Sequence, residues 1–399
     1  MGGRVALKGT DGPEALALAR ARGAVPVAPE RAARALAALA RSAGTGAVPP
    51  AAPAPAVEVL AAPGSLGEDL ATAAGLPVTP TGEAAAVPLE TSALDTRAAV
   101  AAMAEQGVDL VLFAGGDGTA RDIVDAIGDA VPLVGIPTGV KMHSGVFAAT
   151  PDAAGATAAA YLRDPDPGAL RDADVADVDE DAVRAGRVAT RLYGRARVPR
   201  QPMLMLGAKS SSGSGDDREL DALCAALARD AAAAPDRLTL LGPGTTTARV
   251  LTYLGHTGTV LGVDALRGDQ LVASDLDEAG LLALLDQAGA PDPAAPAGPE
   301  PAPSARATLD ASPGVRLILG VVGGQGSLLG RGNQQLSARV LRRIGAAGIE
   351  VVAAADKLLA LDPPALRVDT GDDGLDAELS GYRRVRVAPG RTIVMKVST

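Results

Sequence analysis

The segment FAGGDGTARDI, residues 113–123, places one carboxylate, Asp117, among glycines where an apolar run gives way to a helical pattern. Glycines at the start of a helix let the phosphates of a ligand approach backbone N–H groups, which the helix dipole makes attractive to anions. A carboxylate beside phosphate is unfavourable unless a cation or a proton transfer accompanies it. Asp117 is therefore suited either to hold Mg²⁺ or to accept the proton of a hydroxyl that attacks a terminal phosphoryl group. The alternative is that Asp117 only stabilises the dipole of the following helix, worth about 0.3–1 kcal/mol.

The other residues of this loop are expected to surround a phosphate. Gly115, Gly116, Gly118 and Thr119 form the predicted phosphate loop. Thr119 is also expected to cap the N-terminus of the helix, with Asp122 three residues later completing a capping box.

Two further strands end in glycines. RLTLLGPGTTTARVLTYLG, residues 237–255, predicts a second phosphate cradle formed by Gly242, Gly244, Thr245 and Thr246. VRLILGVVGGQGSLLGRGNQQLS, residues 315–337, carries Asn333 as a further polar binding residue beside the third loop. None of the three junctions is a Walker A loop or a GxGxxG fingerprint. Together they favour a polyphosphate site, although glycine turns after strands often serve geometry alone.

Lysine and histidine are scarce in this chain. Only five lysines and two histidines occur, and Lys141 and His143 fall within the same pentapeptide. A lysine retained where arginine dominates indicates a need for a compact ammonium group, so Lys141 is expected to be a cation beside the phosphates. His143 is expected to contact a hydroxyl or a phosphate. Chance retention of the lysine and a structural role for the histidine are the alternatives.

The elements that position these residues follow an alternating pattern. Continuous apolar runs at 108–114 and 131–136 predict buried strands, residues 92–107 predict a helix, and 12–44 predict two helices around a proline break. This alternation predicts an α/β fold with a doubly wound parallel sheet. Near residue 165 the pattern changes, and 174–198 predicts an antiparallel hairpin. We therefore expect an α/β domain over 1–165 and a β-rich domain over 166–399, with a flexible insertion at 287–307.

Composition restricts the partners of the protein. The 399-residue chain has a net charge of −10, which argues against general binding to nucleic acid or to membrane surfaces. No apolar run is long enough to span a membrane, no signal peptide begins the chain, and one cysteine excludes an internal disulfide. These features predict a cytoplasmic protein that binds small molecules, and they leave open whether it forms a homo-oligomer.

GGDGT is shared by a superfamily that includes NAD kinases, diacylglycerol and sphingosine kinases and, with a final Ser, phosphofructokinases. Six other sequence segments resemble the ATP-NAD kinase-like family, in the branch of the acetoin-catabolism protein X. These segments are LKGTDG (7–12), GIPTGVKMHSGVFA (135–148), LGPGTTT (241–247), TVLGVDAL (259–266), GGQGSLLGRGNQQ (323–335) and VDTGDDGLDAELSGY (368–382). The resemblance runs nearly from end to end.

The resemblance implies an NAD-kinase-like fold and Mg²⁺-dependent transfer of phosphate from ATP to NAD. Asp117 inherits the role of the loop aspartate that acts on the ribose 2′-hydroxyl. Asp369 and Asp372 are implied contacts to the metal, together with Asp117, or to the ribose. The resemblance does not decide between ATP and polyphosphate as donor.

The sequence also departs from the NAD kinase pattern. NAD kinases carry an Asn-Glu pair that grips adenine and a TGST segment, for which the nearest matches here are Val178–Glu180 and PGTTT. Another small polyol or nucleoside as acceptor, or a non-catalytic nucleotide-binding regulator, therefore stays open. Family members also begin with an apolar strand before the GGR of residues 2–4, so the natural chain is expected to start upstream of Met1.

Overall fold

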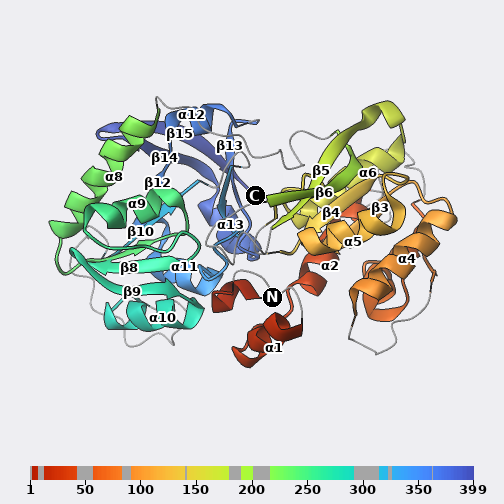
Figure 1. Ribbon diagram of the computed structural model, residues 1–399, viewed down its shortest axis with the longest axis horizontal. Coiled ribbons are helices and arrows are strands. Elements are labelled where there is room, and N and C mark those ends of the chain that lie inside the picture. The colour runs from red at the N-terminus through yellow and green to blue at the C-terminus, as the bar shows by residue number, and fades with distance from the viewer. Residues whose placement is uncertain are drawn as a thin grey trace, which may run out of the picture. The chain divides into compact units, whose positions relative to one another are not determined.

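The computed structural model describes most of the chain in two compact units, shown in Figure 1. The described residues are 2–7, 13–42, 57–82, 91–139, 142–178, 190–200, 216–291, 314–321, 326–361 and 363–399. The first unit spans residues 25–209, and the second combines residues 2–24 with 210–399.

Parallel strands form the centre of the first unit. β3 (Val111–Gly115) pairs in parallel with β4 (Leu133–Pro137), and β1 (Val59–Ala61) pairs in parallel with β2 (Val78–Pro80). The helices of this unit are α2 (Ala28–Ser42), α3 (Glu68–Ala73), α4 (Ala93–Glu105), α5 (Asp117–Ile127) and α6 (Pro151–Arg163). The expected parallel α/β arrangement is confirmed.

The core of the first unit explains the apolar runs of the sequence. All five residues of β4 are buried, as expected for a strand covered on both faces. Both phenylalanines of the chain meet here, because the rings of Phe113 and Phe147 lie edge to face with centroids 5.6 Å apart. Helices α2 and α6 pack closely at Gly155, where a Cβ atom would lie 2.1 Å from the carbonyl oxygen of Ala35.

The antiparallel hairpin belongs to the first unit. β5 (Leu170–Val178) pairs with β6 (Thr190–Pro199), as the sequence predicted, and the two strands share the core of β3 and β4 through Val175 and Val198. The compact units therefore divide near residue 209 rather than at the expected 165. The pattern does change at 165, but the hairpin buries its apolar face against the preceding helix and strands.

A mixed nine-stranded sheet forms the second unit, in the order β11-β13-β15-β14-β12-β10-β7-β8-β9. The strands are β7 (Leu238–Leu241), β8 (Val263–Arg267), β9 (Gln270–Leu276), β10 (Val315–Gly320), β11 (Ser327–Leu329), β12 (Ile349–Val352), β13 (Ala365–Val368), β14 (Gly381–Ala388) and β15 (Arg391–Ser398). β7, β10, β12 and β14 run in one direction, and β11, β13 and β15 run in the other. The C-terminal ends of the strands in one group therefore lie beside the N-terminal ends of the strands in the other group.

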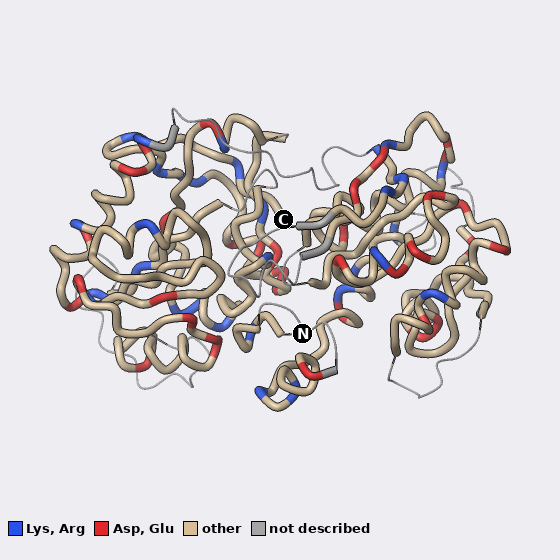
Figure 2. The backbone as a smooth tube through the Cα atoms, viewed as in Figure 1, with Lys and Arg blue, Asp and Glu red and all other residues tan. Residues whose placement is uncertain are grey.

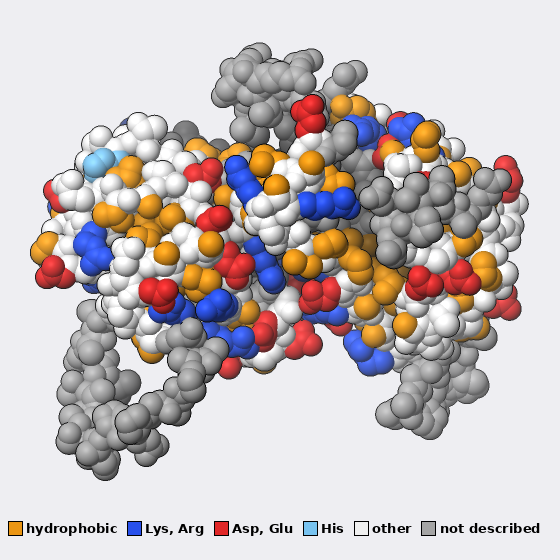
Figure 3. Space-filling model, turned by 90° about the horizontal axis from the view of Figure 1, so that it is seen from below, with side chains coloured by type: hydrophobic (Ala, Val, Ile, Leu, Met, Phe, Trp, Pro, Cys, Tyr) orange, Lys and Arg blue, Asp and Glu red, His pale blue; other side chains and the backbone are white. Residues whose placement is uncertain are grey.

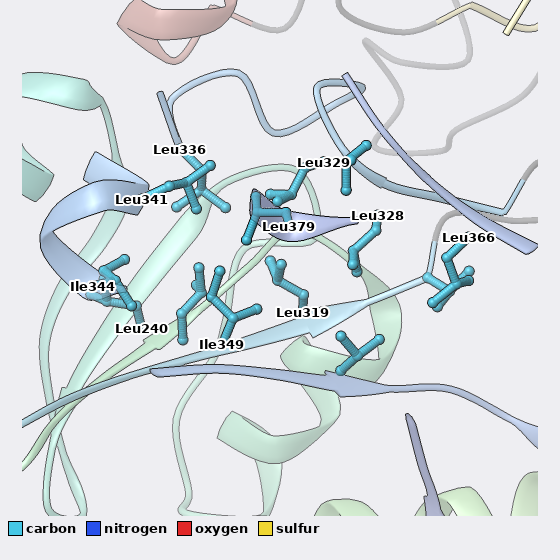
Figure 4. Close-up of a cluster of buried hydrophobic side chains, with 14 of the residues drawn as sticks. Leu240, Leu319, Leu328, Leu329, Leu336, Leu341, Ile344, Ile349, Leu366 and Leu379 are labelled. Atoms are coloured by element: carbon cyan, nitrogen blue, oxygen red, sulfur yellow. The ribbon is translucent and has the colours of Figure 1, made fainter. Parts of the chain in front are cut away.

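Helices complete the second unit. They are α1 (Pro13–Ala21), α8 (Asp216–Ala232), α9 (Thr245–Tyr253), α10 (Glu278–Gln287), α11 (Ala338–Ile344), α12 (Ala355–Leu359) and α13 (Asp373–Leu379). Figure 4 shows the buried aliphatic cluster of this unit, in which Leu240 and Leu319 of the sheet lie near Leu341 of α11. On the other side of the sheet, Leu223 of α8 and Val250 of α9 pack with Ile318.

Charged residues are spread over both units (Figure 2). On the face shown in Figure 3, basic side chains are interspersed with acidic and apolar ones. Within the described ranges, no helix combines the length and the apolar character needed to cross a bilayer. Most of the expected insertion at 287–307 lies outside the described residues.

Candidate active site

Strand β3 delivers the GGDGT segment to the start of helix α5. Gly115 ends the strand, Gly116 is the N-cap residue, and the helix begins at Asp117. Thr119 is therefore inside the first turn and does not cap the helix, contrary to the sequence expectation. Its side chain instead covers Gly115, where a Cβ atom would lie 2.4 Å from the Thr119 hydroxyl oxygen.

Asp122 also differs from its expected role in a capping box. Its carboxylate accepts a hydrogen bond from the Arg97 guanidinium of α4 at 2.7 Å. The side chain therefore joins two helices of the first unit and does not reach back to the helix N-terminus.

The Asp117 carboxylate is buried and accepts hydrogen bonds from a distant part of the chain. Only 5% of the residue is exposed. The backbone N–H of His143 donates to Oδ2 at 2.6 Å, and that of Ser144 donates to Oδ1 at 3.0 Å. Backbone N–H groups aimed at a carboxylate stabilise its ionised form and compensate its burial. The charge at the centre of the loop is thus balanced in part by main-chain dipoles.

The loops after β3 and β4 approach each other through backbone alone. The N–H of Thr138 donates to the carbonyl oxygen of Gly115 at 3.1 Å. A Cβ atom on Gly139 would lie 3.2 Å from the Cα of Gly116, which is tighter than ordinary van der Waals contact. Gly139 therefore allows the two loops to form one surface at the carboxyl end of the parallel pair, where open α/β sheets commonly bind their ligands.

The segment after this loop carries the scarce basic residues. His143 is half-buried, and its contact with Asp117 is made by the main chain. Lys141 lies outside the described residues. Of the described residues before and after it, Gly139 lies against Gly116 and His143 donates to Asp117.

The second predicted cradle forms a separate strand–helix turn in the second unit. Gly244 caps α9 with φ of +146°, and the hydroxyl of Thr247 donates to the carbonyl oxygens of Gly242 and Gly244 at 2.5 and 2.9 Å. Thr245 is exposed and Thr246 is half-buried at the start of this nine-residue helix. The loop is compact, and its first turn presents backbone N–H groups beside the carboxyl end of β7.

The remaining predicted residues are Asn333, which follows β11, and Asp369 and Asp372, which follow β13. Because β11 and β13 run opposite to β7, these residues lie at the other end of the strands from the turn between β7 and α9. The side chain of Asn333 accepts from the Gly330 N–H and donates to the Leu328 carbonyl oxygen, both at 2.9 Å. It is 4% exposed. Asn333 therefore braces its own turn, and it is not brought together with Gly242 or Gly244.

Asp369 and Asp372, the predicted metal or ribose contacts, lie in the turn between β13 and α13 and at the start of α13. Asp372 is the N-cap of α13, accepting from the Leu375 N–H at 3.0 Å and from the Arg342 guanidinium at 2.7 Å. These bonds, with the Leu375 N–H first, lower the pKa of Asp372 below its ordinary value. Asp369 is 4% exposed in the adjoining turn.

A magnesium ion needs several oxygen ligands in near-octahedral geometry. Within the described parts of the chain, no group of three or more His, Cys, Asp or Glu side chains is arranged to hold a metal ion. In addition, Asp372 is engaged as a helix cap and Asp117 accepts two main-chain hydrogen bonds. The described residues thus do not fit a Mg²⁺ site built from protein side chains alone.

Comparison with known families gives one match. Residues 19–165 match the family model described as the ATP-NAD kinase N-terminal domain. This region is therefore similar to the N-terminal domain of ATP-NAD kinases. The match contains β3, the GGDGT loop and the Asp117–Ser144 contact, and it ends before β5. The comparisons with curated proteins and with solved structures gave no match.

The sequence did not single out two residues of the matched region that contact its loops. Ser144 belongs to the segment GIPTGVKMHSGVFA, but a serine in a sequence does not indicate which residues it will contact. Arg31 in the first turn of α2 donates from Nε to the carbonyl oxygen of Pro137, the last residue of β4. Both contacts join residues distant in sequence, so local pattern could not reveal them.

Proposed function

We propose that the protein transfers the γ-phosphoryl group of ATP to a hydroxyl of a small nucleotide, with NAD as acceptor and NADP as product. The observation that carries this proposal is the ATP-NAD kinase N-terminal domain with Asp117 at the start of α5, beside the joined loops of β3 and β4. The resemblance of the flanking words to the acetoin-catabolism branch supports the same kind of chemistry and leaves the physiological acceptor to be tested.

In this reaction the acceptor hydroxyl oxygen forms a bond to the γ-phosphorus while the bond from that phosphorus to the β–γ bridging oxygen breaks. ADP leaves with the bridging oxygen, and the hydroxyl proton passes to Asp117. The N–H groups of Gly118 and Thr119 and the ammonium of Lys141 are proposed to bind phosphate oxygens.

The loop containing Gly242, Gly244, Thr245 and Thr246 is proposed as a second phosphate-binding segment. Its support is the start of α9, which carries backbone N–H groups with the positive end of the helix dipole. His143 is proposed to contact a substrate hydroxyl or phosphate. We place the protein in the cytoplasm, in keeping with its one cysteine, Cys224, which is buried and forms no disulfide.

One assay tests the proposed function. The purified full-length protein is incubated with ATP-Mg²⁺ and NAD, and NADP is measured with an NADP-specific dehydrogenase. Parallel reactions replace NAD by nucleosides and small polyols, scored by ADP release, and replace ATP by polyphosphate. NADP formation with ATP supports the proposal, whereas ADP release with another acceptor only would replace NAD as the substrate.

A nucleotide-binding regulator is the second candidate, and one observation favours it. Both oxygens of Asp117 already accept main-chain hydrogen bonds, which is a sufficient structural reason for the carboxylate. Such a regulator, associated with acetoin catabolism through the family resemblance, would bind nucleotide without turnover. Calorimetric binding of ATP or NAD together with no product from any acceptor would favour it over the kinase.

A further inference from the structure

We propose that Ser144 is a positioning residue of this site, which holds the Asp117 carboxylate in place by tying it to strand β5. The inference rests on the proposed phosphoryl transfer and adds a residue that acts through Asp117 without touching substrate. Its basis is a continuous set of hydrogen bonds from the phosphate loop to the antiparallel hairpin.

Ser144 is connected in two directions. Its backbone N–H donates to Oδ1 of Asp117 at 3.0 Å. Its hydroxyl donates to the carbonyl oxygen of Ala176 at 2.9 Å and accepts from the Ala176 N–H at 3.1 Å. The residue is 1% exposed, so water does not compete freely for these bonds. One buried side chain thus satisfies both backbone groups of a strand residue while its own backbone holds the carboxylate.

The partner on β5 lies at an irregularity of the hairpin. The pairing of β5 with β6 shifts register between Val175 and Ala176. The N–H of Gly145 also donates to the carbonyl oxygen of Asp174 at 2.9 Å. Residues 144 and 145 therefore lie along the edge of β5 that does not pair with β6. There the Ser144 hydroxyl makes the two hydrogen bonds to Ala176 that a backbone N–H and carbonyl group of a neighbouring strand would make.

The following residues bind the neighbouring strand. The N–H of Gly135 donates to the carbonyl oxygen of Val146, and the N–H of Ala148 donates to that of Gly135, both at 2.9 Å. The segment 144–148 consequently bridges β4 and β5 directly beside the phosphate loop. A movement of Ser144 would be transmitted to Asp117 because the connection between β5 and the Asp117 carboxylate consists only of backbone groups and the short Ser144 side chain.

Serine is suited to this place because a hydroxyl donates and accepts at once. Alanine at 144 would remove both bonds to Ala176 and leave the Asp117 contact supported by the main chain alone. Misplacement of a reacting group by about 1 Å can lower a rate by about 10²-fold. Loss of the Ser144 hydroxyl is therefore expected to reduce turnover more than substrate binding.

The test compares Ser144→Ala with Thr150→Ala in the full-length protein. Thr150 is a matched control, since its buried hydroxyl accepts from the Ala153 N–H at 3.1 Å to cap α6 and does not contact Asp117. For Ser144→Ala we expect kcat for NADP formation to fall about 10- to 10²-fold, with KM for ATP and NAD within about threefold. Thr150→Ala should lose thermal stability and keep kcat within about threefold. Ser144→Thr keeps the hydroxyl and should retain most of kcat.

Amide hydrogen exchange supplies a readout that does not depend on turnover. Exchange at the His143 and Ser144 amides should accelerate at least about tenfold in Ser144→Ala and stay unchanged in Thr150→Ala. Unchanged exchange in Ser144→Ala, or equal losses of kcat in both variants, would overturn the proposal. If wild type forms no NADP, the proposed function fails, while the exchange comparison still decides whether Ser144 holds the loop. If Ser144→Ala does not fold, a loss of kcat above about tenfold in Ser144→Thr with unchanged exchange counts against the inference.

Discussion

The carboxylate of Asp117 accepts a hydrogen bond from the backbone N–H of Ser144 at 3.0 Å, although the two residues are separated by 27 positions in the sequence. A carboxylate placed among glycines beside a phosphate site thereby gains main-chain dipoles that oppose its charge. The helix dipole of α5 contributes as well, because Asp117 is the first residue of the helix. The acidic residue of GGDGT thus has a structural partner in addition to any substrate.

Asp117→Asn tests both roles of this carboxylate. The amide oxygen can still accept one N–H, but its NH₂ group would face the other backbone donor, so we expect a stability loss of about 1–3 kcal/mol. If Asp117 accepts the hydroxyl proton, kcat should also fall about 10²–10⁴-fold. Nucleotide affinity should be similar or higher, because a negative charge beside phosphate is removed. Urea denaturation, calorimetric binding and the NADP assay measure the three quantities. Near-normal NADP formation would remove Asp117 as proton acceptor.

Gly115→Ala should disturb the phosphate loop by overpacking. The added methyl group would overlap the side chain of Thr119, 2.4 Å from its hydroxyl oxygen. We expect a loss of about 1–3 kcal/mol in the free energy of unfolding, together with weaker ATP binding. Gly320→Ala is the control, because a methyl group there meets no atom within 4 Å. Chemical denaturation of both variants checks the prediction, which equal stabilities would refute.

Thr247→Val should open the turn between β7 and α9. The buried hydroxyl of Thr247 donates to the carbonyl oxygens of Gly242 and Gly244, and removing this donor from the Gly242 carbonyl oxygen should cost about 1–3 kcal/mol. Thr157→Val is the matched control, since the buried hydroxyl of Thr157 has no hydrogen-bond partner among the described residues. Its replacement should be neutral or stabilising. ATP affinity measured in both variants tests the second cradle, which requires a loss in Thr247→Val only.

Asp372→Ala should reveal a pH-dependent contribution of the α13 cap. The Leu375 N–H and the Arg342 guanidinium lower the pKa of Asp372, so its contribution is present above the unfolded pKa and is lost as pH falls through the folded pKa. Near pH 7 we expect a cost of about 0.5–2 kcal/mol, the usual range for an N-cap. The gap to wild type should narrow when pH falls below about 4, near the ordinary pKa of aspartate. Urea denaturation at both pH values decides, and a gap that persists at low pH contradicts the assignment. Glu378→Ala, at an exposed position of the same helix, should show little effect at either pH.

Local pattern predicted the strands and helices around the site. Continuous apolar runs identified β3 and β4, and alternation with helices identified the parallel pairing, because burial on both faces leaves a distinct composition. The N-cap of α5 was expected at Thr119 and lies at Gly116, three residues earlier, since Thr119 resembles a cap but packs over Gly115. The boundary near residue 209 was missed because the hairpin changes the local pattern while sharing the core of the first unit.

The candidate site was predictable only in part for a different reason. A motif names Asp117 but cannot name Ser144 or Ala176, whose contacts depend on how the chain returns to the sheet. Likewise, Asn333 and Asp372 have residue types that favour ligand binding, yet their side chains complete a turn and a helix cap. The direction of each strand decides which loops lie together at one end of the sheet. The sequence around β13 does not reveal that this strand runs opposite to β7.

The second unit is assembled from two pieces of chain, because residues 2–24 fold with residues 210–399. A Cβ atom on Gly3 would lie 2.8 Å from atoms of the Gln334 side chain, so this early segment packs against a residue far along the sequence. A truncation that removes residues 2–24 would therefore take material from the second unit, although the first unit begins directly afterwards at residue 25.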